Sequence, residues 1–203
     1  MKFTSHQTDK LEYARYLTAS LAYLAGRQRD AAGLIIFDDE VRNFVPPSTR
    51  QGQLARLMHA VEKAEVGNRT DYEKPFSHVR EFLHRRGLIA VISDFWESPE
   101  QVVKTIAPPR LHGNEVVLFH VLDPQEIRPR FKDPALLEDL ESGATLEVSP
   151  EYAAKEYPAK IDAHLEELRS KAKGNGLDYF LIDTSRPLDG ALREYLAARG
   201  GRK

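Results

Sequence analysis

Residues 87–97 of this chain are Gly-Leu-Ile-Ala-Val-Ile-Ser-Asp-Phe-Trp-Glu. Five consecutive apolar residues, Leu88–Ile92, stand between Gly87 and the polar pair Ser93 and Asp94. A short apolar run rich in β-branched residues predicts a strand that is buried on both faces, as in parallel sheets covered by helices. Ligands of such sheets bind at the carboxyl ends of the strands, and Asp94 lies at such an end.

The composition is that of an ordinary globular domain. The chain has 203 residues, of which 41% are hydrophobic and 30% charged, and its formal net charge is -2. This balance gives no overall field that would attract nucleic acid or an anionic membrane. There is no cysteine, no apolar run of the roughly 20 residues that span a bilayer, and no apolar signal-peptide core in Met1–Gln7. We therefore expect a cytoplasmic protein with one domain over residues 1–203.

The rest of the chain alternates between strand and helix patterns. Further apolar strands are predicted at Ala31–Phe37, Glu115–Val121 and Tyr179–Ile182, and a short antiparallel partner that ends at Pro46-Pro47 is predicted at Val41–Val45. Helices are predicted to begin near Asp9, Leu54, Thr70, Ser98, Pro150 and Leu188. Residues 127–149 interrupt the alternation as an irregular insertion, with short strands near Arg130 and at Ala144–Val148. The pattern favours one doubly wound α/β domain with right-handed crossovers.

Asp94 is the strongest candidate for a functional residue. An ionised aspartate at the carboxyl end of a strand is a hard oxygen ligand, and with the hydroxyl of Thr70 it can hold Mg²⁺ or Mn²⁺. A carboxylate in this place can equally cap the helix that follows its strand. The spacing alone does not separate the two interpretations.

A second acidic cluster, Asp38-Asp39-Glu40, follows another predicted strand. Together with Asp94 it suggests a phosphoacceptor receiver-like or metal-dependent phosphotransfer domain. In a receiver domain, however, a helix follows the acidic pair, whereas Val41–Val45 looks extended. The later strands also end without the lysine that a receiver needs. We therefore favour a hairpin turn at Asp38-Asp39.

The sequence offers little else for catalysis. It has no Gly-x-Ser-x-Gly elbow and no glycine-rich phosphate loop before a helix, so we expect a protein that is not an enzyme, with no catalytic or cofactor-binding residues. Trp96, the single tryptophan, stands beside Asp94. It is either a lid over the core or an exposed contact anchor, and the lid is the favoured interpretation.

Five stretches in order resemble a known family. They are Lys10–Arg15 with Leu21–Leu24, Asp30–Phe37, Ile92–Phe95, Leu122–Glu126 and Asp139–Gly143. Together they resemble the bacterial domain-of-unknown-function family that is linked to MoxR-type AAA+ ATPases, whose carboxy-terminal part is similar to the von Willebrand factor A domain. The resemblance implies a three-layer Rossmann-like fold with a mostly parallel sheet and a metal-ion-dependent adhesion site.

The resemblance also implies that part of this site is absent. The adhesion site consists of an Asp-x-Ser-x-Ser loop after the first strand, a threonine and an aspartate, and Thr70 and Asp94 match the last two. The first motif and its central strand would lie before Met1. We therefore expect a fragment that binds Mg²⁺ or Mn²⁺ weakly, with a gap between Ala31–Phe37 and Leu88–Ile92. Such a chain would be marginally stable, or completed by a homodimer or by a strand from elsewhere.

The function implied by the resemblance is that of a protein–protein interaction module. The expected partner is a MoxR-type AAA+ ATPase, and the expected role is to aid the assembly or activation of other protein complexes. Contact would be made through the incomplete metal-ion-dependent adhesion site. We expect no nucleic acid and no membrane contact from this chain.

Overall fold

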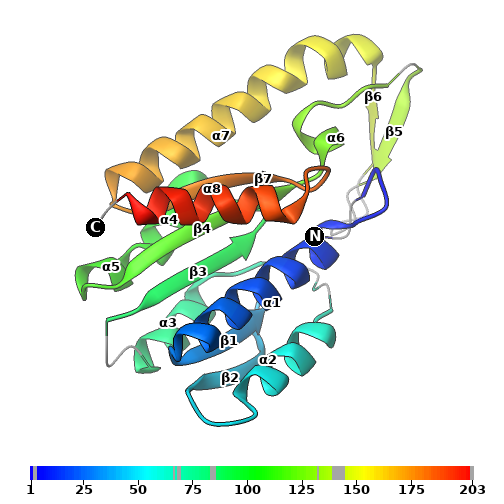
Figure 1. Ribbon diagram of the computed structural model, residues 1–203. Helices are drawn as coiled ribbons and strands as arrows, with labels where there is room; N and C mark the ends of the chain where they lie inside the picture. Colours follow the sequence, from blue (N-terminus) through cyan, green and yellow to red (C-terminus); the bar gives the residue numbers. More distant parts are fainter. Residues whose placement is uncertain are drawn as a thin grey trace.

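The computed structural model describes residues 1, 4–65, 67, 70–82, 86–131, 133–138 and 145–201 (Figure 1). Its centre is a sheet of three parallel strands, β3 (Leu88–Ser93), β4 (Glu115–Leu122) and β7 (Asp178–Asp183), in the order β3-β4-β7. The middle strand is buried from Val116 to Leu122, as its largely apolar sequence predicts. The three strands predicted here are confirmed, with ends that differ by one residue.

A hairpin lies beside this sheet. β1 (Ala32–Phe37) and β2 (Val41–Ser48) pair in antiparallel fashion, as predicted, and the Asp38 N–H donates to the Glu40 carbonyl at 3.0 Å in the turn. The prediction that Pro46-Pro47 ends the second strand was wrong, because β2 continues to Ser48. β2 is an edge strand, where the missing proline N–H leaves no partner unpaired.

The hairpin and the parallel strands are separate sheets. In the part of the chain that the structure describes, β1 is paired with β2 alone and β3 with β4 alone. The gap that we expected between these two strands is therefore present. Figure 1 shows helix α1 lying across this region, over β1 and β3.

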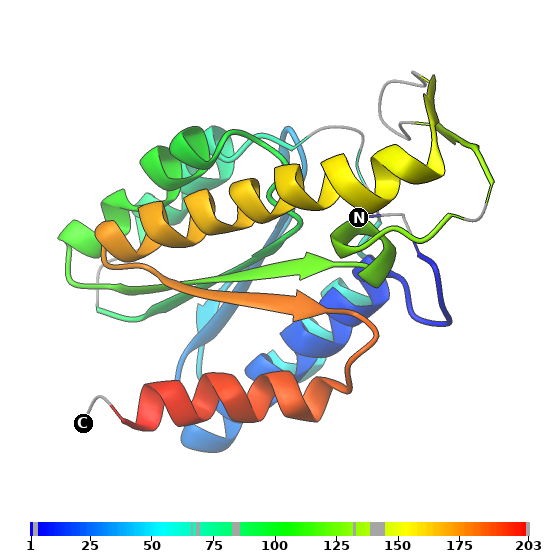
Figure 2. The same ribbon diagram turned by 90° about the horizontal axis from the view of Figure 1, so that it is seen from above.

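Helices cover the strands on both faces and produce three layers (Figure 2). One outer layer contains α1 (Lys10–Gln28), α2 (Gln53–Glu62) and α8 (Leu188–Gly200). The opposite layer contains α3 (Glu73–Phe82), α4 (Pro99–Ile106) and α7 (Tyr157–Gly174). The alternation of strands and helices predicted this mixed α/β architecture.

Shorter elements connect the layers. They are α5 (Pro108–Leu111), α6 (Pro124–Ile127), the π-helix η1 (Tyr152–Glu156) and the antiparallel strands β5 (Ala135–Glu138) and β6 (Thr145–Val148). The small hairpin expected in the insertion is thus present, but its first strand begins at Ala135 and not near Arg130. The helix predicted to begin near Ser98 is confirmed, since Ser98 is the N-cap residue of α4.

Helix α1 is buried only in its first half. Asp9 caps its first turn by accepting the Glu12 N–H at 2.6 Å. The buried residues are Lys10, Tyr13, Ala14 and Leu17, and all of them lie in the first half of the helix. The second half has apolar residues at the same spacing but none that is buried.

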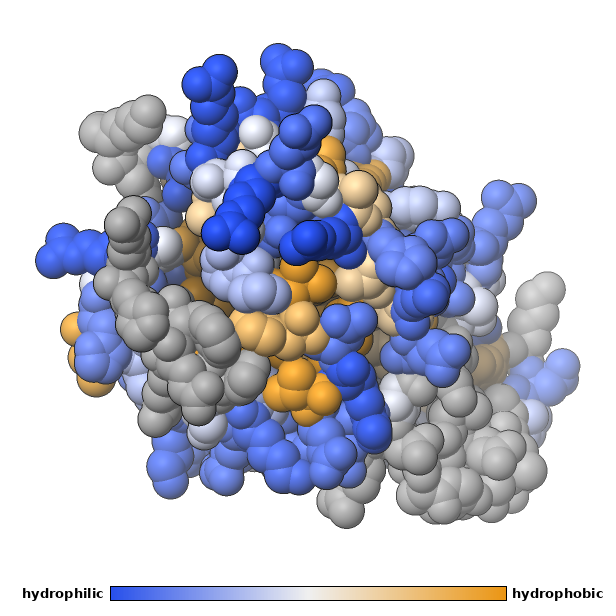
Figure 3. Space-filling view, turned by 90° about the horizontal axis from the view of Figure 1, so that it is seen from below, coloured by the Kyte–Doolittle hydropathy of each residue, from blue (hydrophilic) through white to orange (hydrophobic). Residues whose placement is uncertain are grey.

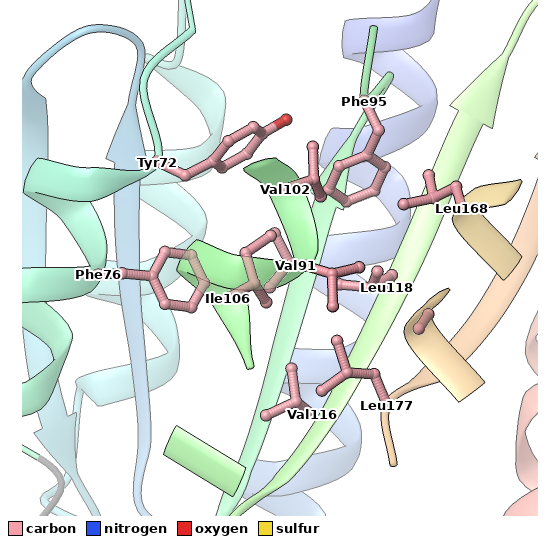
Figure 4. Packing of buried hydrophobic residues seen from close by; sticks show 12 residues of the cluster. Tyr72, Phe76, Val91, Phe95, Val102, Ile106, Val116, Leu118, Leu168 and Leu177 are labelled. Carbon is pink, nitrogen blue, oxygen red and sulfur yellow. The ribbon is translucent and has the colours of Figure 1, made fainter. Parts of the chain in front are cut away.

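Among the described residues the core forms three clusters, and the two larger ones lie on opposite faces of the parallel sheet. Successive residues of β4 alternate between them, because neighbouring side chains of a strand point to opposite faces. Figure 4 shows the cluster under α3, α4 and α7, where Tyr72 and Phe76 reach from the α3 segment toward Val91 and Phe95. This cluster joins the hairpin side of the molecule to the parallel sheet, since Phe37 of β1 packs against it.

The surface has apolar as well as charged regions. Figure 3 shows a face on which apolar side chains gather in the centre and hydrophilic ones surround them. Among the described residues, no helix has both the length and the apolarity to cross a bilayer.

A leucine pair tests the assignment of the core. Leu118 in β4 is fully buried, whereas Leu111 in α5 is 87% exposed. We expect Leu118→Ala to lower the free energy of unfolding by about 2–5 kcal/mol, because it leaves a cavity. Leu111→Ala should change it by less than about 0.5 kcal/mol. Urea denaturation followed by tryptophan fluorescence measures both, and equal effects would contradict the assignment.

Candidate functional site at the carboxyl ends of the parallel strands

Polar residues gather where the three parallel strands end. Asp94 follows β3, Asp123 follows β4 and Thr184 follows β7, and each is at most 8% exposed. Glu126 in the short helix α6 joins them. We call Asp94, Asp123, Glu126 and Thr184 the carboxyl rim. Parallel strands end at the same edge of a sheet, which brings residues from distant parts of the chain together.

A buried lysine lies at the centre of the rim. Lys10 is 2% exposed, and its Nζ lies 2.9 Å from Asp94 Oδ2 and 2.6 Å from Glu126 Oε1. The amino group of Met1 also donates to Asp94 Oδ2, at 2.8 Å. Buried charges are tolerated when they are paired and hydrogen-bonded. Two carboxylates therefore face two ammonium groups in this site.

The pairing shifts the pKa values of these groups. Burial acts to lower the pKa of Lys10, but the charges of Asp94 and Glu126 outweigh it and the pKa is raised. Burial acts to raise the pKa of Asp94, but Lys10 and the Met1 amino group outweigh it and the pKa is lowered. For Glu126, burial outweighs the charge of Lys10 and the hydrogen bonds from Lys10 and the Asp123 backbone, and the pKa is raised.

The segment before α1 is tied to the rim as well. The Asp123 carboxylate accepts the Ser5 N–H at 2.7 Å and the Ser5 hydroxyl at 2.6 Å. Asp123 also forms a capping box with Glu126 at the start of α6. The His6 Nε2 lies 2.9 Å from the Thr184 hydroxyl. These contacts hold the amino-terminal segment across the ends of β4 and β7.

The turn after Asp94 has an unusual backbone. Phe95 is fully buried and has φ of 40°, a value that bulky residues rarely adopt. Two histidines hold the turn, since His120 Nε2 donates to the Asp94 carbonyl at 2.8 Å and His164 Nε2 donates to the Phe95 carbonyl at 2.9 Å. Strain of this kind persists where the surroundings fix it, and it is concentrated at functional sites.

The hydrogen bonds define the protonation of His120. A carbonyl oxygen only accepts, so the proton is on Nε2 and the other nitrogen, Nδ1, accepts the Tyr179 hydroxyl at 2.8 Å. Burial lowers the pKa of His120 to about 3. The ring therefore stays neutral at physiological pH and acts as a fixed support for the turn.

Trp96 points away from the core. Its side chain is 46% exposed and stacks on the His164 ring, with 5.9 Å between the centroids and 23° between the planes. The favoured interpretation of Trp96 as a lid was wrong. Phe95 fills the core position in its place, stacked 5.9 Å from the Tyr72 ring. Trp96 is thus an exposed aromatic side chain in a fixed orientation beside Asp94.

The two predicted metal ligands are placed differently from expectation. Asp94 faces Lys10, and it does not cap α4, whose N-cap is Ser98. Thr70 is half-buried in a loop that lies against the β1–β2 turn, where the Asp71 N–H donates to the Asp38 carbonyl at 2.9 Å. The hydrogen bonds that the structure describes do not join Thr70 to Asp94.

This geometry does not fit a divalent cation at Asp94 while Lys10 is in place. An ion bound there would face the positive charge of the lysine at short range. The described residues also contain no cluster of three or more histidine, aspartate or glutamate side chains suited to a metal. Binding of Mg²⁺ or Mn²⁺ by Thr70 and Asp94 stays a prediction.

The second acidic cluster forms the predicted hairpin turn. Arg42 Nε lies 2.8 and 2.7 Å from the two carboxylate oxygens of Asp38, and its Nη2 lies 3.2 Å from Asp39 Oδ1. Burial acts to raise the pKa of Asp38, but Arg42 outweighs it and the pKa is lowered. Both aspartates are thus bound by an arginine of their own hairpin.

Sequence reasoning missed Lys10, His120 and His164. A signal for Lys10 was present, because it lies on the same helical face as Ala14 and Leu17, where an apolar residue is expected. His120 likewise interrupts the apolar run of β4. A polar residue in an apolar pattern indicates a buried partner, but the pattern does not say which residue that partner is.

Comparison with known proteins assigns the chain to a family. The family "Protein of unknown function DUF58" matches residues 1–167. The chain belongs to the DUF58 family. An uncharacterized protein of Mycobacterium tuberculosis is 24% identical over 200 residues, which cover 94% of this chain and 61% of that protein. A protein of Mycobacterium bovis, also uncharacterized, matches equally. This DUF58 chain thus spans about three fifths of the length of these relatives.

Solved structures show the same fold. The conserved hypothetical protein BatB from Bacteroides thetaiotaomicron matches with a TM-score of 0.58 and 14% identity, over 90% of this chain and 83% of that one. An aerotolerance-related membrane protein from Bacteroides fragilis matches with a TM-score of 0.54 and 16% identity, over 86% and 82% of the two chains. At this level of identity the likeness of the DUF58 chain to these proteins concerns the fold alone.

Removal of the buried lysine should destabilise the protein. We expect Lys10→Met to lower the free energy of unfolding by about 3–5 kcal/mol, because it leaves buried carboxylates without their partner. The matched control is Lys74→Met, since Lys74 forms an exposed ion pair with Glu40 at 3.6 Å, which is worth at most about 1 kcal/mol. Urea denaturation measures both variants. A loss for Lys10→Met as small as that of the control would contradict the central role of Lys10.

The same ion pairs predict the dependence of stability on pH. Asp94 has a lowered pKa in the folded state, so its contribution is present above the usual value of 3.8 and is lost as the pH falls below it. Lys10 has a raised pKa, so its contribution is present below 10.5 and is lost as the pH rises beyond it. The raised pKa of Glu126 acts in the opposite sense to that of Asp94.

Thermal unfolding between about pH 3 and pH 11 measures this dependence. We expect the melting temperature to fall at both ends of the range. Asp94→Asn should weaken the fall on the acid side, because the carboxylate that titrates there has been removed. If the melting temperature of this variant fell at low pH as steeply as that of the wild type, other carboxylates would control the loss of stability.

Proposed function

We propose that this DUF58 chain is a non-enzymatic protein–protein interaction module whose contact site is the Asp94–Trp96 turn beside the carboxyl rim. The observation that carries the proposal is the exposed Trp96 side chain, fixed by stacking on His164 next to the buried charges of Asp94 and Lys10. Tryptophan is enriched among the residues that dominate the energy of protein interfaces.

The rigidity of the turn supports this role. The backbone of the turn is fixed by two histidine hydrogen bonds, so Trp96 loses little conformational freedom when a partner covers it. The chemistry of these residues favours a binding role over a catalytic one. Lys10 is held by ion pairs with both Asp94 and Glu126. The pKa of His120 is too low for proton transfer near neutral pH.

We further propose that the fold is of the von Willebrand factor A type. The support is the parallel order β3-β4-β7 between two helical layers, together with the resemblance of the five sequence stretches. In that interpretation, Asp94 and Thr70 belong to a metal-ion-dependent adhesion site that is incomplete in this chain. Lys10 supplies the positive charge at Asp94 that a cation would supply elsewhere.

The partner that we propose is a MoxR-type AAA+ ATPase, and the proposed role is to aid the assembly or activation of protein complexes. This partner follows from the sequence resemblance alone. The Asp94–Trp96 turn is suited to such a contact because its exposed anchor is aromatic, which favours a partner surface with an apolar pocket.

Binding measurements test the proposed contact site. We expect the purified chain to bind a MoxR-type ATPase of the same organism in biolayer interferometry, and Trp96→Ala to weaken binding at least about tenfold. Leu111→Ala removes another exposed apolar side chain, on α5, and should leave binding unchanged. Absence of binding, or equal effects of the two variants, would overturn the proposal.

The metal hypothesis is tested in the same assay. Titration with Mg²⁺ or Mn²⁺ should have little effect on the wild-type chain if Lys10 takes the place of the cation. A strong increase of affinity that Asp94→Asn abolishes would instead show that a divalent ion binds at Asp94.

A further inference from the structure

Helix α1 borders a cavity at the end that is distant from the carboxyl rim. The cavity has a volume of about 620 Å³ and lies between the last turns of α1, the start of β1, the end of β2 and the first half of α2. Figure 1 shows these segments side by side. We call this space the α1–α2 cavity. Sites for small molecules typically have volumes of about 300–1,000 Å³, so the space is large enough for a ligand.

Two glycines form part of the cavity wall. Gly26 belongs to α1, and Gly52 is the N-cap residue of α2. A Cβ atom placed on either of them would meet no heavy atom of another part of the chain within 4 Å. The wall at these two points is therefore bare backbone that faces open space and not packed side chains.

Three arginines also line the cavity. Arg27 comes from the last turn of α1, Arg29 is the C-cap residue of that helix, and Arg50 comes from the loop before α2. Asp30 is the one acidic residue that the structure places in the lining. Among the described residues, none of the three guanidinium groups forms an ion pair, although other arginines of the chain do. The cavity therefore has an excess of positive charge.

Two of these arginines occupy positions that do not favour arginine. Arg29 has φ of 62°, in the left-handed region where glycine is the usual residue after a helix. Arg50 lies two residues before the N-cap of α2, at the positive end of the helix dipole. The negative end of the α1 dipole accounts for Arg27, but it does not account for the other two. Side chains that are kept at a cost in stability indicate a function.

The cavity lining has an apolar part as well. It includes Ala22 and Tyr23 of α1 and Leu54 and Leu57 of α2. Tyr23 is 52% exposed and Leu54 is 36% exposed, so both are accessible from solvent. An accessible aromatic ring can stack on a flat ligand group. The lining thus suits a molecule that has both an anionic part and a flat, weakly polar part.

We propose that the α1–α2 cavity binds a nucleoside diphosphate. Its phosphate groups pair with the three arginines, and its base lies against Tyr23 and Leu54. Guanidinium groups bind phosphate through two parallel hydrogen bonds, which a lysine cannot provide. A diphosphate also has enough negative charge to face three arginines, whereas a single carboxylate does not. The arginines take the place of a glycine-rich phosphate loop, which the sequence lacks.

This site is separate from the proposed contact site. Helix α1 has 19 residues and is therefore about 28 Å long. Lys10 lies at its first residue, beside the carboxyl rim, and Gly26 lies near its other end. The nucleotide is thus a ligand of the hairpin side of the molecule, and its binding does not require Asp94 or Trp96.

Isothermal titration calorimetry with ADP tests the proposal. The buffer contains EDTA and no phosphate, so that neither a metal ion nor another anion masks the charges. Adenosine and pyrophosphate are the controls, because each represents one half of the ligand. We expect the Kd of ADP to be at least about tenfold lower than that of either control. Absence of ADP binding at about 1 mM would overturn the proposal. Equal binding of ADP and pyrophosphate, or of ADP and adenosine, would overturn it as well.

A matched pair of glycine variants tests the location. Gly26→Leu places a side chain in the open space of the cavity and should weaken ADP binding at least about tenfold. Gly190→Leu places the same side chain in equally open space on α8, away from the cavity, and should leave binding unchanged. Leucine favours a helix more than glycine does, so both variants should fold, and thermal unfolding verifies this. Equal ADP affinities of the two variants would contradict the proposal.

Arginine variants test the recognition of phosphate. Arg50→Gln should weaken ADP binding at least about tenfold, whereas Arg56→Gln, on an exposed position of α2 outside the cavity lining, should not. Arg29→Gly should weaken binding likewise and yet raise the melting temperature, because glycine adopts the left-handed backbone without strain. Wild-type affinity in Arg29→Gly, or equal affinities in the two glutamine variants, would contradict the assignment. Trp96→Ala should retain ADP binding, which separates this site from the proposed contact site.

Discussion

The interaction on which the rest of this site depends is the buried contact of Lys10 with Asp94 and Glu126. It joins the first turn of α1 to the end of β3 and to α6, three elements that are distant in the sequence. A buried ion pair is stable when its geometry satisfies both charges, and otherwise the desolvation of the ions exceeds their attraction. The contact therefore positions the first turn of α1 at the carboxyl end of the parallel sheet, and it also stabilises the fold. It also gives Asp94 a positively charged neighbour without any metal.

The same end of the sheet contains a strained turn that the core holds in place. Phe95 keeps a left-handed backbone because its ring is packed in the core and because His120 and His164 donate hydrogen bonds to the two carbonyl groups of the turn. The result is that Trp96 leaves the core and stands at the surface next to Asp94. The position of the Asp94–Lys10 ion pair and the exposure of Trp96 thus follow from one packing arrangement. This arrangement holds the site rigid.

The division into two sheets imposes a second constraint. The parallel strands β3, β4 and β7 are held by continuous pairing, whereas the hairpin is attached through α1 and the aromatic contacts of Tyr72. Side-chain packing across the gap replaces backbone hydrogen bonds in joining the two parts. The apolar residues of β1 and of the second half of α1 are half-buried or exposed.

The sequence by itself determined the strands, the helices and the position of Asp94, because each of these depends on local periodicity and on local turn chemistry. It also indicated the hairpin at Asp38-Asp39, and the resemblance to a known family implied the gap beside β3. Only the tertiary structure decided the partner of Asp94, the orientation of Trp96 and the burial of α1. These features depend on contacts between residues that are far apart in the sequence. A pattern of apolar residues indicates which side chains are buried, but it does not indicate which residues they contact. Lys10 is the clearest case, since its place on the inward face is visible in the sequence while its two carboxylate partners lie 84 and 116 residues away.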